Sequence, residues 1–200
     1  MQLKNIGCIL MIFLIISCQN SNNSYLPKPR LYPKVNYPTK VYEDFDASYC
    51  SFTFQKPEYA QVVQDKYFFD EKPVDPCWFD LNIDTLNSTL HCSYIPVLDR
   101  AHFDKLIGDS FRMIGEHNKK ADYREDQLIL NAQGVQGILF EVDGPVASPL
   151  QFFLTDSTTH FLRASLYFNS TVNPDSIAPV YEFVKEDVFK MISSFEWIED

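Results

Sequence analysis

Hydrophobic and polar residues alternate along much of this chain, and the period of the alternation changes from one segment to the next. A period of two, typical of a strand with one buried face, begins with Cys50, Phe52 and Phe54. Similar alternation, or a short apolar run, returns several times downstream. The strands predicted in this way cover residues 50–54, 59–65, 78–84, 89–95, 128–131, 137–142, 150–156 and 160–168. We expect the second of these strands to form a hairpin with the first, and the third with the fourth.

Two segments have apolar residues three and four positions apart, which is the spacing of an α-helix with one buried face. The first follows Asp99, a side chain that can cap a helix N-terminus, and ends in the polar residues 117–120. The second is opened by the turn-forming residues 173–176 and has Pro179 in its first turn, where proline is tolerated. The apolar positions are Phe103, Leu106, Ile107, Phe111 and Ile114 in the first helix, and Ile177, Val180, Tyr181, Val184, Val188, Met191, Ile192 and Phe195 in the second.

The order of these elements, with connections of hairpin length, predicts an α+β fold built on an antiparallel sheet. A three-residue turn at 157–159 sets the register of the last hairpin, with Leu154 opposite Leu162 and Phe153 opposite Arg163. Both faces of this hairpin are rich in apolar residues, so the sheet requires cover on both faces. Flanking helices on the two sides would make an α/β/α sandwich, which at the level of the fold is similar to Mog1/PsbP-like domains.

The N-terminus has a different pattern. Lys4 precedes an apolar run over residues 6–16, which is shorter than the roughly 20 residues that cross a bilayer and is typical of a signal peptide. The sequence Ile15-Ile16-Ser17-Cys18 follows, and it matches a lipobox, in which the thiol receives a diacylglyceryl group before cleavage. We expect residues 1–17 to be a lipoprotein signal peptide and Cys18 to carry acyl chains that hold the protein on a membrane. An ordinary signal peptide or a single anchor helix is the alternative.

The segment after the lipobox cysteine is polar and rich in proline, and its composition predicts an extended tether. We place this tether at residues 18–46 and a single α+β domain at residues 47–200. Tyrosines between the prolines could dock on the domain surface. The prolines are Pro27, Pro29, Pro33 and Pro38, and the tyrosines are Tyr25, Tyr32 and Tyr37.

The charge balance excludes some partners. The chain has 17 Lys and Arg against 27 Asp and Glu, a net charge of −10, and loss of Lys4 with the signal peptide makes it −11. This balance argues against nucleic acid and against electrostatic binding to an anionic membrane, so the lipid must supply the anchor.

Three cysteines remain in the domain: Cys50, Cys77 and Cys92. Three thiols cannot all pair within one chain. An oxidising envelope permits one disulfide, and three buried thiols acting as small apolar residues are an equally good interpretation.

Motifs that carry catalytic chemistry are absent from the sequence, and the four histidines lack the spacing of metal ligands. We therefore predict no catalytic residue, no metal and no cofactor. The one candidate catalytic group is Asp156 with His160 and Arg163, because a carboxylate can orient an imidazole for base catalysis. The register places Arg163 on the opposite sheet face from His160. A structural pair of Asp156 and His160 that closes the hairpin is the better interpretation.

The last hairpin also suggests an aromatic and guanidinium cluster made of Phe153, Phe161, Arg163 and Tyr167. An arginine among aromatic rings on an apolar face is costly to bury without a partner. We expect this cluster to bind either the final helix, through Glu182 or Glu186, or a partner protein. The alternative is an edge arginine whose stem covers the rings while its head reaches water.

A series of short motifs resembles the GldD family of gliding-motility lipoproteins of Bacteroidota, and together they cover nearly all of the mature chain. Leu31 and Ala164 stand where the family usually has glycine, a departure that concerns backbone freedom. The matching motifs are 27–30 (Pro-Lys-Pro-Arg), 56–60 (Lys-Pro-Glu-Tyr-Ala), 76–78 (Pro-Cys-Trp), 151–157, 160–163, 166–168, 173–176 and 179–180.

The resemblance implies a lipid-anchored, non-enzymatic component of the gliding motility and type IX secretion apparatus, with other envelope proteins of that apparatus as partners. It brings no established catalytic residues. Gln19 after the lipidated cysteine favours the outer membrane, and the absence of acidic residues from 19–24 favours a domain that faces the periplasm. The alternative is an envelope lipoprotein with an enzymatic or ligand-binding pocket around Asp156, His160 and Arg163.

Overall fold

The computed structural model describes residues 34–67, 71–170 and 174–198. The chain divides into two units, Met1–Tyr32 and Pro33–Asp200, and the description below concerns the second. The predicted signal peptide and Cys18 lie outside the described residues. Within the described residues, no helix combines the length and the apolar composition needed to cross a membrane.

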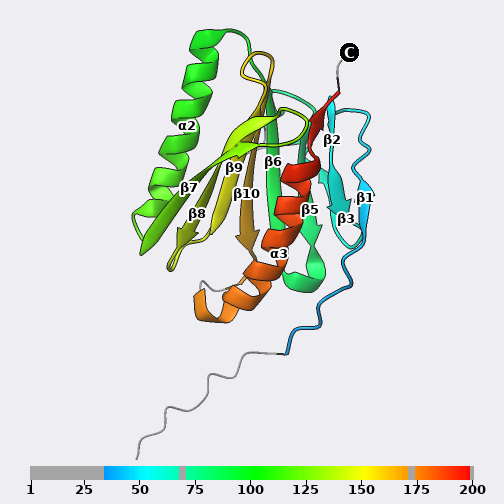
Figure 1. Cartoon of the computed structure of the whole chain (residues 1–200), viewed down its shortest axis with the longest axis vertical. Helices are drawn as coiled ribbons and strands as arrows, with labels where there is room; N and C mark the ends of the chain where they lie inside the picture. The colour runs from blue at the N-terminus through cyan, green and yellow to red at the C-terminus, as the bar shows by residue number, and fades with distance from the viewer. Residues whose placement is uncertain (1–33, 68–70, 171–173, 199–200) are drawn as a thin grey trace, which may run out of the picture. The chain divides into compact units, whose positions relative to one another are not determined.

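The domain is built on one antiparallel sheet of seven strands, which confirms the predicted α+β class (Figure 1). Consecutive strands along the chain are neighbours in most of the sheet, because short connections favour hairpins. The exception brings β10 against β6 in the middle of the sheet. In spatial order the strands are β4 (Gln61–Gln64), β5 (Trp78–Ile83), β6 (Ser88–Pro96), β10 (His160–Phe168), β9 (Leu150–Thr155), β8 (Gln136–Asp143) and β7 (Tyr123–Leu130).

The register predicted for the last hairpin is confirmed, with Leu154 opposite Leu162 and Phe153 opposite Arg163. Ser157 in its turn has a φ of 68°. The predicted pairing of residues 78–84 with 89–95 is also confirmed as β5 against β6. Their connection is a short 3-10 helix, η1 (Asp84–Leu86), followed by Asn87 in the left-handed conformation.

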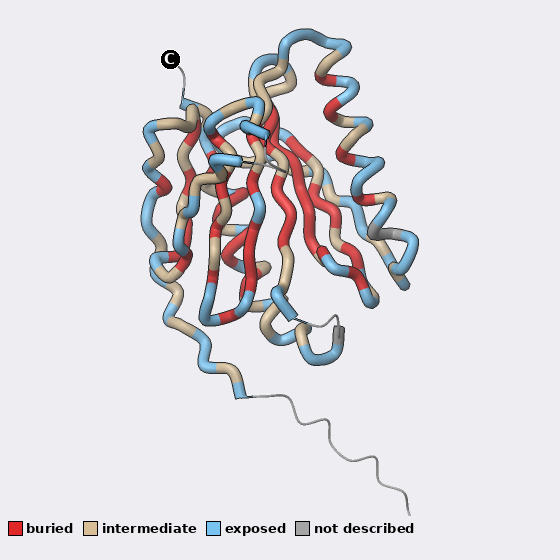
Figure 2. Tube along the Cα trace, turned by 180° about the vertical axis from the view of Figure 1, so that it is seen from behind, coloured by how far each residue is buried: buried red, intermediate tan, exposed pale blue. Residues whose placement is uncertain are grey.

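Two helices cover opposite faces of the sheet, as the apolar pattern of both faces requires. Helix α2 (Arg100–Asn118) begins after Asp99, whose carboxylate accepts a hydrogen bond of 2.7 Å from the N–H of His102, as expected of the cap. Helix α3 (Pro174–Ser194) covers the other face. Figure 2 shows buried residues concentrated in the strands between the helices. The α2 side packs Phe103, Leu106 and Ile114 on Phe140, Phe153 and Phe161, and the α3 side packs Val184, Val188 and Met191 on Phe152, Leu154 and Leu162.

The hairpin predicted between residues 50–54 and 59–65 does not form. The second segment becomes β4, which pairs with β5 at the sheet edge. The first becomes two short strands, β2 (Phe52–Thr53) and β3 (Gln55–Pro57), which pair with β11 (Glu196–Trp197) and β1 (Tyr42–Asp44). The reason is aromatic packing: Phe52 and Phe54 lie in a buried cluster with Phe45, Phe79 and Phe195 at ring distances of 4.6–6.3 Å.

Strand β1 lies inside the range expected to be tether. The compact unit begins at Pro33 rather than at residue 47. Lys40 donates a hydrogen bond to a carbonyl of α3, and residues 42–44 form β1, which pairs with β3. The expected docking of a tether tyrosine is found at Tyr37, whose ring lies 4.7 Å from that of Phe183.

Cys50 and Cys77 form a disulfide, with their Cα atoms 5.1 Å apart, and Cys92 is a buried free thiol. The question left open by the cysteine count is thus answered by one bridge and one thiol. Burial raises the pKa of the Cys92 thiol, and the charge of Asp80 adds to this effect.

Candidate functional site

Two aromatic residues of the predicted partner-binding cluster, Phe153 and Phe161, are core residues beneath α2. Phe153 and Phe161 are 3% and 1% exposed, and their rings stack 5.1 Å apart. The ring of Phe103, from α2, meets Phe161 edge-on. The final helix does not cover them, because α3 packs against the opposite sheet face.

Arg163 lies opposite Phe153, as the register predicts, but its guanidinium does not stack on that ring. Its Nη2 donates a hydrogen bond of 2.8 Å to Oε1 of Gln151 on the neighbouring strand β9. The expected partners Glu182 and Glu186 belong to α3, and Glu186 pairs instead with Lys40 at 2.9 Å. Burial lowers the pKa of Arg163, while the charges of Tyr167 and Asp109 oppose this shift.

Arg163 borders a groove of about 440 Å³ between α2 and strands β5, β6 and β10. Aromatic rings and polar side chains line this groove together, so it offers both apolar surface and hydrogen-bonding groups. Of the other three residues of the predicted cluster, Phe161 and Tyr167 also line it. The main lining residues are Asp65, Trp78, His91, Asp109, Phe161, Arg163, Ser165 and Tyr167.

Ionisable side chains line this groove, among them His91 and the carboxylates of Asp65 and Asp109. His91 Nδ1 lies 2.6 Å from Oδ1 of Asp80, and this hydrogen bond raises the pKa of His91 against the effect of partial burial. Burial raises the pKa of Asp65, and the nearby Asp80 adds to it. Together with Arg163, the groove is therefore lined by ionisable groups of both kinds.

Asp156, His160 and Arg163 do not converge on one pocket. Oδ1 of Asp156 accepts hydrogen bonds from the backbone N–H groups of Thr158, Thr159 and His160 at 2.8–3.0 Å. The contact between Asp156 and His160 is thus made to the backbone and not to the imidazole. Burial alone would raise the pKa of Asp156, but these bonds, led by that of His160, lower it to about 2.

The His160 imidazole is engaged elsewhere. Its Nδ1 lies 2.6 Å from the hydroxyl of Tyr94, and its ring stacks 4.8 Å from that of Trp197. Tyr94 belongs to the core cluster on the α3 side of the sheet, whereas Arg163 borders the groove beside α2. An acid, a base and a guanidinium separated in this way cannot act on one substrate atom.

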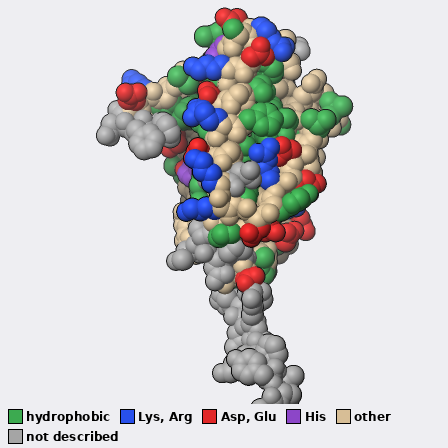
Figure 3. Space-filling model, turned by 90° about the vertical axis from the view of Figure 1, so that its left-hand side faces the viewer, with side chains coloured by type: hydrophobic (Ala, Val, Ile, Leu, Met, Phe, Trp, Pro, Cys, Tyr) green, Lys and Arg blue, Asp and Glu red, His purple; other side chains and the backbone are tan. Residues whose placement is uncertain are grey.

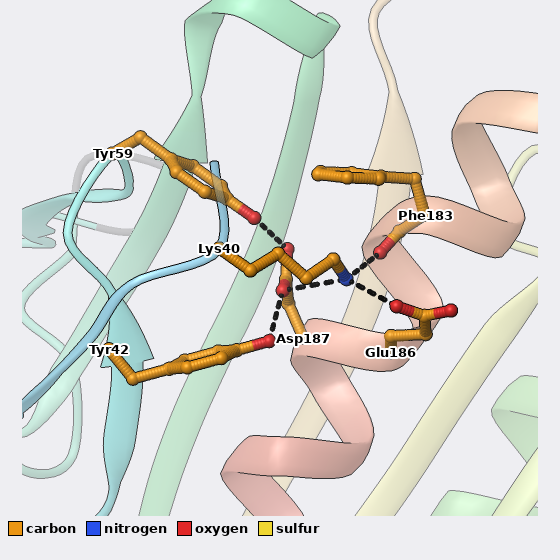
Figure 4. A network of polar contacts seen from close by, with 6 residues as sticks. All are labelled: Lys40, Tyr42, Tyr59, Phe183, Glu186 and Asp187. Atoms are coloured by element: carbon orange, nitrogen blue, oxygen red, sulfur yellow. Dashed lines mark hydrogen bonds and ion pairs between the residues drawn. The ribbon is translucent and has the colours of Figure 1, made fainter. Parts of the chain in front are cut away.

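A second polar centre was not predicted from the sequence. Asp187 of α3 is 4% exposed, and its carboxylate accepts hydrogen bonds from the hydroxyls of Tyr42 at 2.8 Å and Tyr59 at 2.5 Å (Figure 4). Lys40 Nζ completes the network, 3.0 Å from Asp187 and 2.7 Å from the carbonyl oxygen of Phe183, to which it donates. Burial, followed by the hydrogen bond to Asp187, raises the pKa of both tyrosines.

A sequence signal for this centre exists. Asp187 stands three residues after Val184 and four before Met191, which puts it within the apolar stripe of the last helix. A carboxylate in such a stripe requires hydrogen-bond donors from another segment. Here the donors come from residues 40–59, so the network fastens the N-terminal segment of the domain to α3.

Among the residues that the structure describes, no group of three or more His, Cys, Asp and Glu side chains is arranged to hold a metal ion.

The described residues form a disulfide-bonded α/β/α domain whose polar centres lie apart from one another. Residues 22–197 match the family described as "Gliding motility lipoprotein GldD". The chain belongs to this family, which confirms the resemblance of its motifs.

The chain is also similar to a solved structure, the solution structure of cyanobacterial PsbP (CyanoP) from Synechocystis sp. PCC 6803. The two share 14% sequence identity with a TM-score of 0.46, and the alignment covers 84% of this chain and 98% of that one. No curated protein matches the chain.

Proposed function

We propose that this protein is a lipid-anchored, non-enzymatic component of the gliding motility and type IX secretion apparatus. The observation that carries the proposal is membership of the gliding motility lipoprotein family over residues 22–197. The separation of Asp156, His160 and Arg163 supports the non-enzymatic part, because the strongest catalytic candidate of the sequence is not assembled.

Cys18 is the proposed lipid attachment site, because it ends the lipobox and the family is one of lipoproteins. We place the anchor in the outer membrane and the domain in the periplasm, from Gln19 and the lack of acidic residues at 19–24. The disulfide between Cys50 and Cys77 agrees with an oxidising compartment. Other envelope proteins of the apparatus are the proposed partners.

Deletion of the gene, followed by complementation, tests this proposal. We expect loss of colony spreading and of type IX cargo export in the deletion strain, and export alone is the readout if the organism does not glide. The wild-type gene should restore both, and Cys18→Ala should abolish fatty-acid labelling and restore neither. A deletion strain that spreads and secretes normally would contradict the proposal.

The non-enzymatic part is tested separately with Asp156→Asn and His160→Gln. Both variants keep side chains of similar size, and we expect each to restore spreading and export when present at normal levels. Loss of function in a variant that is folded and membrane-bound would instead favour a catalytic or ligand-binding role for these residues.

A further inference from the structure

Strand β7 (Tyr123–Leu130) ends the sheet opposite the short strand β4, and its outer edge is free among the described residues. Its eight residues pair on one side only, with β8. A strand edge of this length exposes backbone N–H and C=O groups that can pair with another chain. Proteins commonly protect such edges with proline, charged side chains or a very short strand. Strand β7 contains no proline and no lysine, and its charged residues Arg124, Glu125 and Asp126 all lie in its N-terminal half.

The C-terminal half of β7 is apolar and exposed. Leu128 and Leu130 are 88% and 75% exposed, although they belong to a regular strand. Figure 3 looks at the side of the molecule that bears α2 and β7, and it shows exposed apolar side chains among the charged ones.

Grooves flank this half on both faces of the sheet. Both grooves have a volume of about 450 Å³, and Leu128 and Leu130 line both. Phe103 and Phe153 also line the first groove, and Phe189 and Ile192 also line the second. Side chains of an added strand alternate between the two faces, so each groove would receive every second one.

The N-terminal half of β7 borders an acidic groove of about 310 Å³ beside α3. Glu125, Asp143 and Glu182 line it, and none of the three has an ion-pair partner among the described residues. The aromatic rings of Tyr123 and Tyr181 line the same groove. Carboxylates next to aromatic rings favour a lysine or arginine side chain.

We propose that the outer edge of β7 is a docking site for an extended, basic segment of another protein, which adds an eighth strand to the sheet. Backbone hydrogen bonds to β7 select an extended segment, Leu128 and Leu130 contact its apolar side chains, and the acidic groove receives a lysine or arginine. The biological part of this inference rests on the proposed function, because the partner is expected within the motility and secretion apparatus.

Two other occupants fit less well. A second copy of this chain, paired antiparallel along β7, would place its Asp126 or its Leu128 opposite Asp126. The net charge of −10 on each copy would add repulsion between the two. The chain's own N-terminal segment carries Pro27, Pro29 and Pro33, which have no N–H to donate to a ladder.

Hydrogen exchange of the mature lipidated protein in detergent micelles tests the docking directly. The probe is a synthetic peptide of about ten residues in which valine alternates with lysine and threonine, a usual length for a strand. We expect it to slow exchange of alternate amides of β7, because every second N–H of an edge strand points outward. A peptide with glutamate in place of lysine should bind more weakly by roughly tenfold or more.

The matched variants are Leu128→Lys and Leu98→Lys, since Leu98 is 78% exposed and lines neither of the two grooves beside β7. Leu128→Lys should abolish the protection, and Leu98→Lys should leave it unchanged. Equal binding of the lysine and glutamate peptides, protection outside β7, or dimerisation through β7 without peptide would each overturn the proposal.

The same two variants at the native locus connect the edge to function. We expect Leu128→Lys to reduce colony spreading and cargo export at normal protein levels, and Leu98→Lys to behave as wild type. If the deletion strain is defective and Leu128→Lys is not, the docking inference is wrong while the proposed function stands. If the deletion strain is normal, the proposed function fails, and the peptide experiment still decides the docking inference.

Discussion

Asp187 shows how one buried carboxylate can organise a segment remote from it in sequence. It lies within the apolar stripe of α3, where an unpaired charge would be costly. Tyr42, Tyr59 and Lys40 compensate it, and they come from a segment more than a hundred residues earlier. Removing the acceptor should therefore loosen the N-terminal segment as well as the helix.

We expect Asp187→Ala to lower the free energy of unfolding by about 2–4 kcal/mol, because it leaves two hydroxyls and an ammonium without their shared acceptor. Chemical denaturation followed by circular dichroism measures this loss. Glu186→Ala is the matched control, since Glu186 also pairs with Lys40 but is largely exposed, and it should cost less than about 1 kcal/mol. Equal effects of the two variants would show that burial of the pair is unimportant.

Asp156 makes stability depend on acid pH. Its pKa is about 2 in the folded protein and has its ordinary value near 3.8 when unfolded. Its contribution is therefore present above about pH 4 and lost as the pH falls toward 2, and solvent screening limits it to about 1 kcal/mol. Asp156→Asn should be less stable than wild type at pH 6, and the difference should shrink toward pH 2. Glu58→Gln, on an exposed side chain, is the control and should change stability at pH 6 by less than about 0.5 kcal/mol.

The sequence predicts the place of these residues better than their contacts. Arg163 stands opposite Phe153 because hairpin register follows from turn length. Its hydrogen-bond partner, Gln151, could not be predicted, because the choice depends on rotamers and on which helix covers that face. The imidazole of His160 likewise turns to Tyr94 and not to the neighbouring Asp156.

At the scale of elements, the strength of the sequence pattern follows the burial of each strand or helix. Strands β5, β6, β9 and β10 were predicted close to their observed ends, because buried strands carry a strong apolar pattern. Strand β7 was predicted only at residues 128–131, since residues 123–127 are polar and become a strand by pairing with β8. Strands of two or three residues, such as β1 and β11, arise from tertiary contacts and leave no periodic signal.

Substitution of two glycines by alanine should change stability in opposite directions, because one glycine is tightly packed and the other is not. A Cβ at Gly137 of β8 would lie 1.9 Å from the carbonyl oxygen of Phe153, whereas a Cβ at Gly108 of α2 meets nothing within 4 Å. We expect Gly137→Ala to cost about 3 kcal/mol or more, and Gly108→Ala to stabilise by about 0.5–1 kcal/mol through helix propensity. Thermal denaturation of both variants measures the difference. A Gly137→Ala protein as stable as wild type would show that β8 and β9 can separate at this point.

At the scale of the whole molecule, the disulfide joins the β2 region to the start of β5 across a sequence separation of 27 residues. Closing a loop of this size reduces the entropy of the unfolded chain and should stabilise by about 3–4 kcal/mol. We expect the double variant Cys50→Ser and Cys77→Ser to lose this amount in urea denaturation. Reductant should destabilise the wild type similarly and leave the double variant unchanged. Cys92, being buried, should resist thiol reagents until the protein unfolds.

The extent of the folded unit was the large-scale feature least visible in the sequence. Proline-rich composition indicated a tether up to residue 46, yet Lys40 and β1 belong to the domain. Composition reports the intrinsic stiffness of a segment, whereas docking depends on donors and acceptors in α3 that are remote in sequence.

The disulfide has a mechanical consequence for a domain held by its N-terminus. Tension applied there would first break the Lys40 and Tyr42 contacts with α3 and then peel β1 from β3. Unravelling would stop at Cys50, because the covalent bond passes the force directly to Cys77 and so to β5, a strand paired on both sides. Residues 34–49 would then act as an extensible spring with a fixed limit of roughly 50 Å, at about 3.3 Å per extended residue. Beyond that limit the force would act on the seven-stranded sheet itself.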